Sequence, residues 1–294
     1  MHDVLTNVPE KTIKCLDKGH VTILDVMPRL VPDDRKTADY AIVQAARVSY
    51  GDGTKTVNED RGLIRYLLRH KHTTPFEMIE FKFSVKLPIF IARQMIRHRT
   101  ANINEYSGRY SMMKDEFYKP DLDNVRQQSS TNKQGGIGSI QENDANDFLS
   151  KIDVVCTQAY EEYEKAIQNG VAREQARMLL PVNLYTEWYW KIDLHNLLHF
   201  LALRCDSHAQ WEIRVFADAM LELIKPIVPW TIEAWEDYHD HRGAIRLTKL
   251  EVDAMVSSLG SFTVNPLKTE NKREQEEWKN KAAKLGLTIR SLEK

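Results

Sequence analysis

A run of hydrogen-bond donors, RQMIRHRTANINEYSGRYS, occupies residues 93–111 of this chain. It holds four arginines, one histidine, two asparagines and a single acid. Guanidinium groups bind phosphate bidentately, and they also stack on or hydrogen-bond to flat heterocycles. Ser107 and Gly108 offer a hydroxyl and a backbone N–H without side-chain obstruction, which lets a phosphate approach closely. The stretch therefore predicts a site for a ligand that is both anionic and planar.

Two other interpretations of residues 93–111 stay open at this point. A charged helix end with local salt bridges gives the same composition, and it is a common outcome for an arginine-rich stretch. A patch that binds nucleic acid is the second alternative. The neighbouring segments lack the basic stripe and interleaved aromatic residues of such patches, and the net charge of the whole chain is −1. The sequence therefore favours a small anion over nucleic acid.

A metal site is a further candidate elsewhere in the chain. His195 and His199 are four residues apart, which is metal-ligand spacing on a helix, and His208 could supply a third ligand. No cysteine or acid stands at a fitting spacing, so we expect no zinc or other metal. The three cysteines are far apart and lack CxxC spacing, which indicates a reducing compartment and no disulfide framework.

The bulk composition is that of an ordinary globular protein. The chain has 294 residues, of which 42% are hydrophobic and 28% charged, enough for one large domain or two small ones with a sizeable core. No apolar run is long enough to span a bilayer, and the start MHDVLTNVPEKTIK lacks a basic segment followed by an apolar block. We therefore expect a cytoplasmic protein that does not associate with membranes.

Hydrophobic periodicity indicates the elements that position the donor-rich stretch. Residues 12–27 predict two strands joined by a turn, and residues 34–48 and 59–71 carry helical periodicity. In IEFKFSVKL, residues 79–87, apolar and polar side chains alternate, as in an antiparallel strand with one buried face. The next residue, Pro88, suits the first turn of a helix.

That helix is predicted to run from Pro88 to about Arg99, with Gln94 and Arg97 on one face. Later elements follow by the same reasoning: a loop over 124–147, helices over about 148–168 and 172–180, a strand over 183–192, and a helical region over 194–225 that breaks near Asp206 at a capping box of Ser207 and Gln210. The mixture predicts an α+β fold, an antiparallel sheet flanked by helices. We divide the chain into a domain of residues 1–245 and a charged, partly helical extension of residues 246–294.

The donor-rich stretch resembles the signature of the flavin-dependent thymidylate synthases. The resemblance rests on Arg97-His98-Arg99, then seven residues, then Ser107 followed by Gly108-Arg109-Tyr110. Three more segments are similar to that family: HKHTTPFE at 70–77, AREQARMLLPVNLYT at 172–186 and LRCDSHAQWEIR at 203–214. Together the similar segments lie within residues 12–240. The resemblance implies a single catalytic domain that assembles into a homotetramer with active sites between subunits.

The same resemblance implies an activity and a set of ligands. The family methylates dUMP to dTMP, with methylenetetrahydrofolate as the carbon donor, reduced FAD as the hydride source and NADPH as the reductant of the flavin. Residues at the family's dUMP positions are Gln94, Arg97, Glu105, Tyr106, Ser107, Gly108, Arg109, Arg177 and Arg204. Residues at its flavin positions are His72, Thr74, Arg97, His98, Arg99, Glu105, Asp193, His195 and His199.

Arg204 matches the arginine that the family places against the uracil ring, and it is the residue we expect to be catalytic. Uracil C5 is a poor nucleophile, and a cation beside N3 and O2 favours the N3 anion, which pushes electron density toward C5. A guanidinium keeps its proton, so its role is electrostatic. Ser107 could be a nucleophile by its pattern, but no histidine–acid pair accompanies it, and a binding role is favoured. No GxGxxG or P-loop motif is present, which fits a family that binds FAD with arginines and helix ends.

Overall fold

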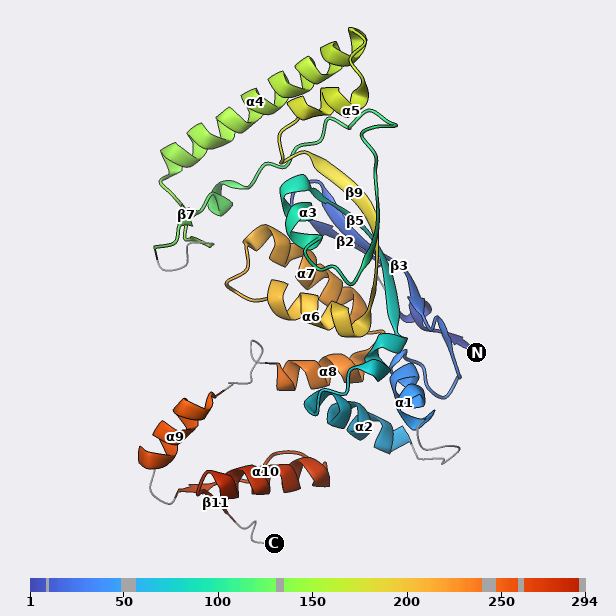
Figure 1. Ribbon diagram of the computed structural model, residues 1–294, viewed down its shortest axis with the longest axis vertical. Coiled ribbons are helices and arrows are strands. Elements are labelled where there is room, and N and C mark those ends of the chain that lie inside the picture. Colours follow the sequence, from blue (N-terminus) through green and yellow to red (C-terminus); the bar gives the residue numbers. More distant parts are fainter. Residues whose placement is uncertain (9–10, 49–56, 131–134, 240–246, 259–261, 291–294) are drawn as a thin grey trace. The chain divides into compact units, whose positions relative to one another are not determined.

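The computed structural model describes residues 1–8, 11–48, 57–130, 135–239, 247–258 and 262–290 (Figure 1). The chain forms two compact units, Met1–Trp235 and Glu236–Lys294. The predicted division into a catalytic domain of residues 1–245 and an extension of residues 246–294 stays a prediction. Within the described residues, no helix has the length and apolar character needed to cross a membrane.

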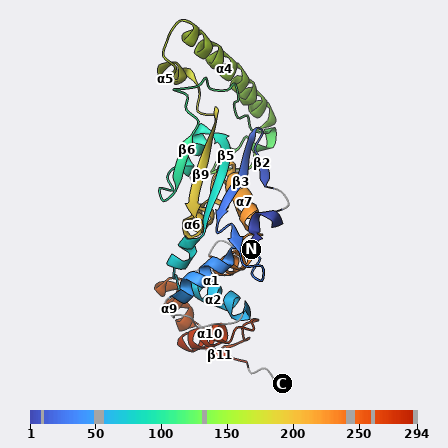
Figure 2. The same ribbon diagram turned by 90° about the vertical axis from the view of Figure 1, so that its right-hand side faces the viewer.

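The first unit is built on a five-stranded sheet in which every neighbouring pair is antiparallel. The strand order is β2-β3-β5-β9-β6, and Figure 2 shows the five strands side by side. The bounds are β2 Thr12–Cys15, β3 Gly19–Met27, β5 Glu80–Pro88, β6 Asn102–Glu105 and β9 Tyr185–Asp193. The predicted strands at 12–27, 79–87 and 183–192 are confirmed, and so is the α+β class with an antiparallel sheet flanked by helices. The short edge strand β6 was not predicted.

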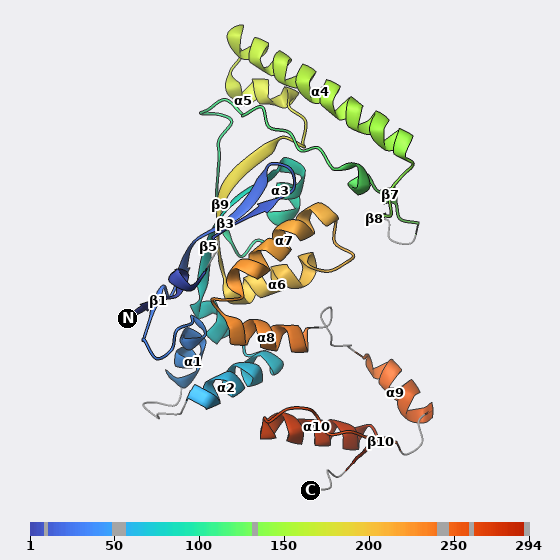
Figure 3. The same cartoon turned by 180° about the vertical axis from the view of Figure 1, so that it is seen from behind.

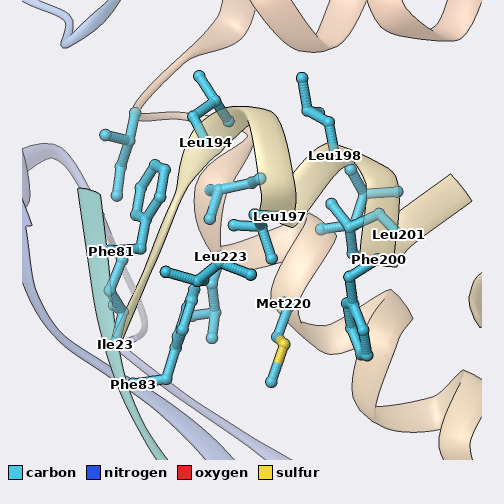
Figure 4. Packing of buried hydrophobic residues seen from close by; sticks show 14 of the residues in the cluster. Ile23, Phe81, Phe83, Leu194, Leu197, Leu198, Phe200, Leu201, Met220 and Leu223 are labelled. Carbon is cyan, nitrogen blue, oxygen red and sulfur yellow. The ribbon is translucent and has the colours of Figure 1, made fainter. Parts of the chain in front are cut away.

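One face of the sheet carries the hydrophobic core. In β5, Phe81 and Phe83 are fully buried, while Lys82 between them is exposed, as the alternation predicted. Two helices cover this face, α6 Leu194–Arg204 and α7 Trp211–Ile224 (Figure 3). Figure 4 shows Ile23, Phe81 and Phe83 of the sheet facing Leu197, Met220 and Leu223 of the helices. Burying side chains of this size gives about 1.5–3 kcal/mol each, so the face holds the helices firmly.

The helices that follow β5 and β9 begin at opposite ends of the sheet. Pro88 is the N-cap of α3, Ile89–Met95, and Asp193 is the N-cap of α6. The register pairs Pro88 with Tyr185 and Glu80 with Asp193, so the two caps lie at opposite ends of the β5–β9 pair. Helix α3 ends earlier than predicted, because Ile96 already caps it and the chain turns toward β6.

The N-terminal helices and the later helix α8 lie below the sheet in Figure 1, and a buried carboxylate joins α1 to α8. Their bounds are α1 Asp39–Val48, α2 Val57–Arg69, η2 Thr74–Met78 and α8 Pro229–Tyr238, with a small pair of strands at β1 His2–Asp3 and β4 Leu30–Val31 beside η1 Val4–Asn7. Asp39 is 0% exposed and accepts hydrogen bonds from the Trp230 N–H, the Thr231 N–H and the Thr231 hydroxyl. The first residue of α1 therefore caps the free amides of α8. The predicted helices at 34–48 and 59–71 are confirmed with shifted starts.

A helical hairpin stands apart from the sheet at the start of β9 (Figure 1). It consists of α4 Glu142–Gln168, α5 Arg173–Ala176 and η4 Arg177–Leu179, preceded by η3 Leu122–Asn124 and the strand pair β7 Gln127–Gln128 and β8 Gly136–Ile137. The predicted loop over 124–147 is wrong at its end. Glu142 and Asp144 favour a helix N-terminus, and Ala145 and Leu149 pack on Val125, so α4 starts within the polar segment. The single helix predicted at 172–180 is divided into α5 and η4.

Two smaller expectations are settled by the remaining helices. The break predicted near Asp206 is confirmed, but the capping box is not, because Gln210 is the N-cap of α7 and makes no side-chain cap.

The second unit contains α9 Lys249–Ser258, α10 Lys272–Lys284, and the parallel pair of β10 Thr263–Val264 and β11 Thr288–Ile289. Asn271 caps α10, and the buried Glu274 accepts from Thr269.

Replacing Asp39 with alanine should destabilise the fold. The Asp39→Ala variant leaves two amides and one hydroxyl of α8 without their acceptor, and we expect the unfolding free energy to fall by about 2–3 kcal/mol. Urea denaturation at pH 8 measures the loss. Asp33→Ala is the matched control, because the Asp33 side chain is 80% exposed. Equal stabilities of the two variants would contradict the capping role.

Candidate functional site

The donor-rich stretch passes through three elements and contributes to two separate clusters. Its first part ends α3, its middle is β6, and its last part is the turn that contains Ser107 and Arg109. We call the first group the helix-end cluster: Gln94, His98, His199 and Arg204. We call the second group the loop cluster: Ser107, Gly108, Arg109, Glu174 and Arg177.

The helix-end cluster joins the end of α3 to the end of α6. Arg204, the last residue of α6, donates from Nε to Nε2 of His98 over 3.1 Å. The His98 ring packs edge-on against Phe200, with 4.9 Å between ring centroids, and lies 6.2 Å from the ring of His199. The His98 backbone N–H donates to the Met95 carbonyl. Backbone and ring contacts together fix where this imidazole accepts a hydrogen bond.

Burial and neighbouring charge keep His98 neutral. Burial, the largest cause, together with the Arg204 cation and His199 lowers the pKa of His98 to about 4. Burial also lowers the pKa of Arg204, although a guanidinium stays charged at any physiological pH. The pair is therefore a cation held by a neutral acceptor, and no carboxylate among the described residues forms an ion pair with Arg204.

Gln94 also belongs to this region, whereas Arg97 and Arg99 project beyond the helix. The Gln94 side chain donates to the side-chain carbonyl of Gln210, at the start of α7. Arg97 and Arg99 are exposed and follow the cap of α3, so the prediction that the helix runs to about Arg99 is wrong, and Arg97 lies outside it. A turn still connects Gln94 to Arg97, since the Arg97 N–H donates to the Gln94 carbonyl.

The loop cluster is held together around Gly108. A Cβ at Gly108 would lie 2.8 Å from Sδ of Met113 and 3.4 Å from Cδ of Arg177, so a side chain here would displace the methionine. Arg109 pairs with Glu174 over 3.3 Å, and Arg177 Nε donates to the Glu174 carbonyl. Because both members of the Arg109–Glu174 pair are more than half exposed, the pair contributes little to stability. Both guanidinium groups can therefore turn to an anion at small cost.

Glu105 and Tyr106 lie between the two clusters on the edge of the sheet. Glu105 is the last residue of β6, opposite Trp188, and accepts from the Thr186 hydroxyl over 2.7 Å. The Tyr106 N–H continues the pairing to the Glu187 carbonyl, and its hydroxyl donates to the Met112 carbonyl. The Glu105 carboxylate is thus oriented by the neighbouring strand.

Four residues at the predicted flavin positions lie near the start of η2 or of α6: His72, Thr74, Asp193 and His195. His72 is exposed. The positive φ of Lys71, +59°, reverses the backbone, so that the His72 N–H donates to the Leu67 carbonyl. The His72 ring then lies 5.9 Å from the ring of Tyr66. Thr74 is exposed at the first position of η2. Asp193 accepts from the Asn196 N–H and side chain, so this carboxylate caps α6.

The two clusters lie along different parts of β9. Arg177 precedes β9 by a few residues, whereas α6, which carries His199 and Arg204, begins directly after it. Figure 1 shows α5 beyond one end of β9 and α6 leading from the other. Within the described residues, no hydrogen bond, ion pair or ring contact joins the helix-end cluster to the loop cluster, so the predicted dUMP residues form two separate sets of contacts.

Sequence reasoning did not assign to the site Glu174 of the loop cluster, nor three residues that contact predicted site residues: Thr186, Phe200 and Gln210. Glu174 stands three residues before Arg177, a helical spacing that could have indicated their contact. The other three depend on tertiary packing and leave no local signal. The described residues contain no group of three His, Cys, Asp or Glu side chains placed to hold a metal ion, so His195, His199 and His208 do not form one.

Comparisons with known proteins agree with one another. A family model described as thymidylate synthase complementing protein, Thy1, matches residues 30–230. A flavin-dependent thymidylate synthase from Dictyostelium discoideum is 52% identical over 280 residues, which are 95% of this chain and 89% of the relative. One from Rickettsia bellii is 49% identical over 286 residues, 93% of this chain and 94% of the relative. The crystal structure of a UMP/dUMP methylase, PolB, from Streptomyces cacaoi bound with 5-Br dUMP has a TM-score of 0.67 and 33% identity, covering 77% of this chain and 98% of that chain.

The lowered pKa of His98 should make stability depend on pH. As the pH falls, the unfolded chain takes up a proton near pH 6.5, while folded His98 resists protonation until about pH 4. The unfolding free energy should therefore decrease between those two values, since the unfolded state binds more protons. Urea denaturation from pH 7 to pH 4 measures this slope. The His98→Gln variant should show a smaller slope, and an unchanged slope would contradict the assignment.

Proposed function

Because the chain belongs to the flavin-dependent thymidylate synthase family, we propose that it methylates dUMP to dTMP with a flavin cofactor. The carbon donor in this proposal is methylenetetrahydrofolate, and the reductant that restores the flavin is NADPH. The observation that carries the proposal is the Arg204–His98 pair, a cation whose hydrogen-bond partner is a neutral residue at one of the family's flavin positions. A fixed cation is the group that uracil activation requires.

Arg204 is the residue that activates the uracil ring. Its guanidinium stabilises negative charge on N3 and O2 and thereby raises electron density at C5. It cannot remove the N3 proton, because arginine does not deprotonate in proteins. Partial burial strengthens the effect, since the interaction between two charges grows as the surrounding dielectric constant falls.

The residues at the flavin positions fit FAD by their chemistry. Arg97 and Arg99 are exposed cations suited to a pyrophosphate, and the exposed His72 and the rings of His98 and His199 can face a flat ring system. When bound, FAD supplies the hydride for the methyl group, and the protein supplies position and charge. Glu105, held by Thr186, can accept from the nucleotide or hold an arginine in place.

The loop cluster suits the phosphate of dUMP. Ser107 presents a hydroxyl, and Arg109 and Arg177 present two guanidinium groups, while Gly108 lets the turn pack closely against Met113 and Arg177. The exposed Arg109–Glu174 pair contributes little, and a phosphate can accept two parallel charge-assisted hydrogen bonds from a guanidinium, so the anion can replace Glu174 as the partner of Arg109. Tyr106, whose hydroxyl is engaged by Met112, keeps this turn in shape.

The separation of the two clusters supports an active site between chains of a homotetramer. In that arrangement the helix-end cluster of one chain meets the loop cluster of another, so that uracil and phosphate of one nucleotide are bound by different subunits. Exposed apolar side chains on α4 and η4 support an interface there: Phe148 48%, Val154 66%, Met178 78% and Leu179 48%. Exposed groups of this kind mark protein–protein contacts when they form a patch.

The absorbance spectrum tests the proposed function directly. Purified protein should be yellow or become so with added FAD, and NADPH should bleach it. Adding dUMP and methylenetetrahydrofolate to the reduced protein should then restore the colour and yield dTMP. A protein that takes up no FAD under any condition would refute the proposal.

Subunit mixing tests the shared site. Arg109→Ala and Arg204→Ala should each lose activity, the first by weakening dUMP binding by about 1.5–3 kcal/mol and the second by lost uracil activation. After the two variants are unfolded, mixed and refolded together, some sites combine an intact loop cluster with an intact helix-end cluster, and activity should return in part. Refolding each variant alone is the control. If the mixture stays as inactive as the single variants, the site is not shared between chains.

A further inference from the structure

We propose that His98 is a positioning residue for Arg204, which leaves only the two terminal nitrogens of the guanidinium to face the uracil ring. This inference rests on the proposed function and gives His98 a role distinct from contact with the flavin. The bond between Arg204 Nε and His98 Nε2 is 3.1 Å long and joins the end of α6 to the end of α3.

The direction of this hydrogen bond is fixed by chemistry. Arginine has only donors, so the Nε2 atom of His98 must carry its lone pair and the ring proton must be on Nδ1. The ring is also held by its edge-on contact with Phe200, a fully buried residue of the core. Burial and the adjacent Arg204 and His199 favour the neutral ring, which is the form that can accept.

A guanidinium can bind a planar ligand in its own plane along either of two hydrogen-bonding edges. One edge uses Nε–H with one terminal N–H, and the other uses the two terminal nitrogens alone. Because Nε–H donates to His98, the first edge is occupied. Arg204 therefore meets its ligand with two parallel donors and no acceptor.

Two parallel donors distinguish the two forms of uracil. In neutral uracil, O2 accepts but N3 carries a hydrogen, which would oppose one of the donors. When N3 has lost its proton to water, O2 and N3 form a pair of adjacent acceptors that matches the two donors. His98 thus fixes which pair of Arg204 donors is presented and holds that pair in place for the ionised ring, the form with more electron density at C5. A carboxylate at this position would also orient Arg204, but it would cancel the charge that stabilises the anion.

The ionisation of bound dUMP tests this role without turnover. Loss of the N3 proton changes the ultraviolet absorbance of uracil, so difference spectra of the dUMP complex against pH report where the bound ring ionises. His98→Phe keeps a ring against Phe200 but removes the acceptor, and it should raise that pH by about one unit, a tenfold loss of preference for the anion. His98→Gln places a carbonyl near the position of Nε2 and should restore most of the wild-type value.

Two further comparisons make the result decisive. His98→Asn is equally polar but too short to reach Arg204, so it should behave as His98→Phe does, and it replaces that variant if the phenylalanine protein does not fold. In the double variant His98→Phe with Arg204→Gln, bound dUMP should ionise at the same pH as in Arg204→Gln alone, because both changes remove the same interaction. His208→Gln, at a histidine whose side chain is 78% exposed, is the control expected to match wild type.

The outcomes separate this inference from the function on which it rests. If wild-type protein binds neither dUMP nor FAD, the proposed function is wrong and the inference with it. A second outcome is that wild-type protein and the His98 variants lower the ionisation pH of dUMP equally, while the variants show reduced FAD absorbance. In that case His98 contacts the flavin only, and the inference alone is overturned. An effect of His98→Phe that adds in full to that of Arg204→Gln would overturn it as well.

Discussion

The antiparallel pairing of β5 with β9 is the constraint on which the arrangement depends. It runs from Glu80 opposite Asp193 to Pro88 opposite Tyr185, with Phe81, Phe83, Trp188 and Trp190 buried along it. Each strand passes directly into a helix, β5 through Pro88 and β9 through Asp193. Because the strands are antiparallel, these helices start at opposite ends and approach each other over the sheet. The meeting of His98 with Arg204 is a consequence of that pairing.

The two clusters contain cations with different kinds of partner. Arg204 has a neutral partner and keeps its full charge in a partly buried place. Arg109 has an acidic partner, Glu174, but on the surface, where such a pair contributes little. Neither guanidinium is thus committed to a strong internal ion pair. A chain of net charge −1 can in this way present concentrated positive charge at selected places without a basic surface.

Much of this arrangement follows from local sequence signals, and the rest from contacts that such signals do not contain. The alternation in β5 and β9 comes from one buried face and is readable directly. Edge strand β6 pairs through its backbone and has exposed side chains, so residues 102–105 gave no alternation. Helix α3 ends at Met95 because the chain must reach β6, and nothing in RQMIRHR marks that end. Motif residues were identifiable by type, but their division between two clusters required the fold.

The choice of a histidine beside Arg204 shows how orientation and charge can be controlled separately. A carboxylate would fix the guanidinium more strongly, since charged hydrogen bonds are the stronger ones, but it would neutralise the cation. A hydrophobic neighbour would leave the cation free to turn, with its Nε–H competing for the ligand. A neutral imidazole, kept neutral by burial, accepts one donor and leaves the charge intact. In the uracil site proposed for Arg204, that combination would serve both binding geometry and electrostatics.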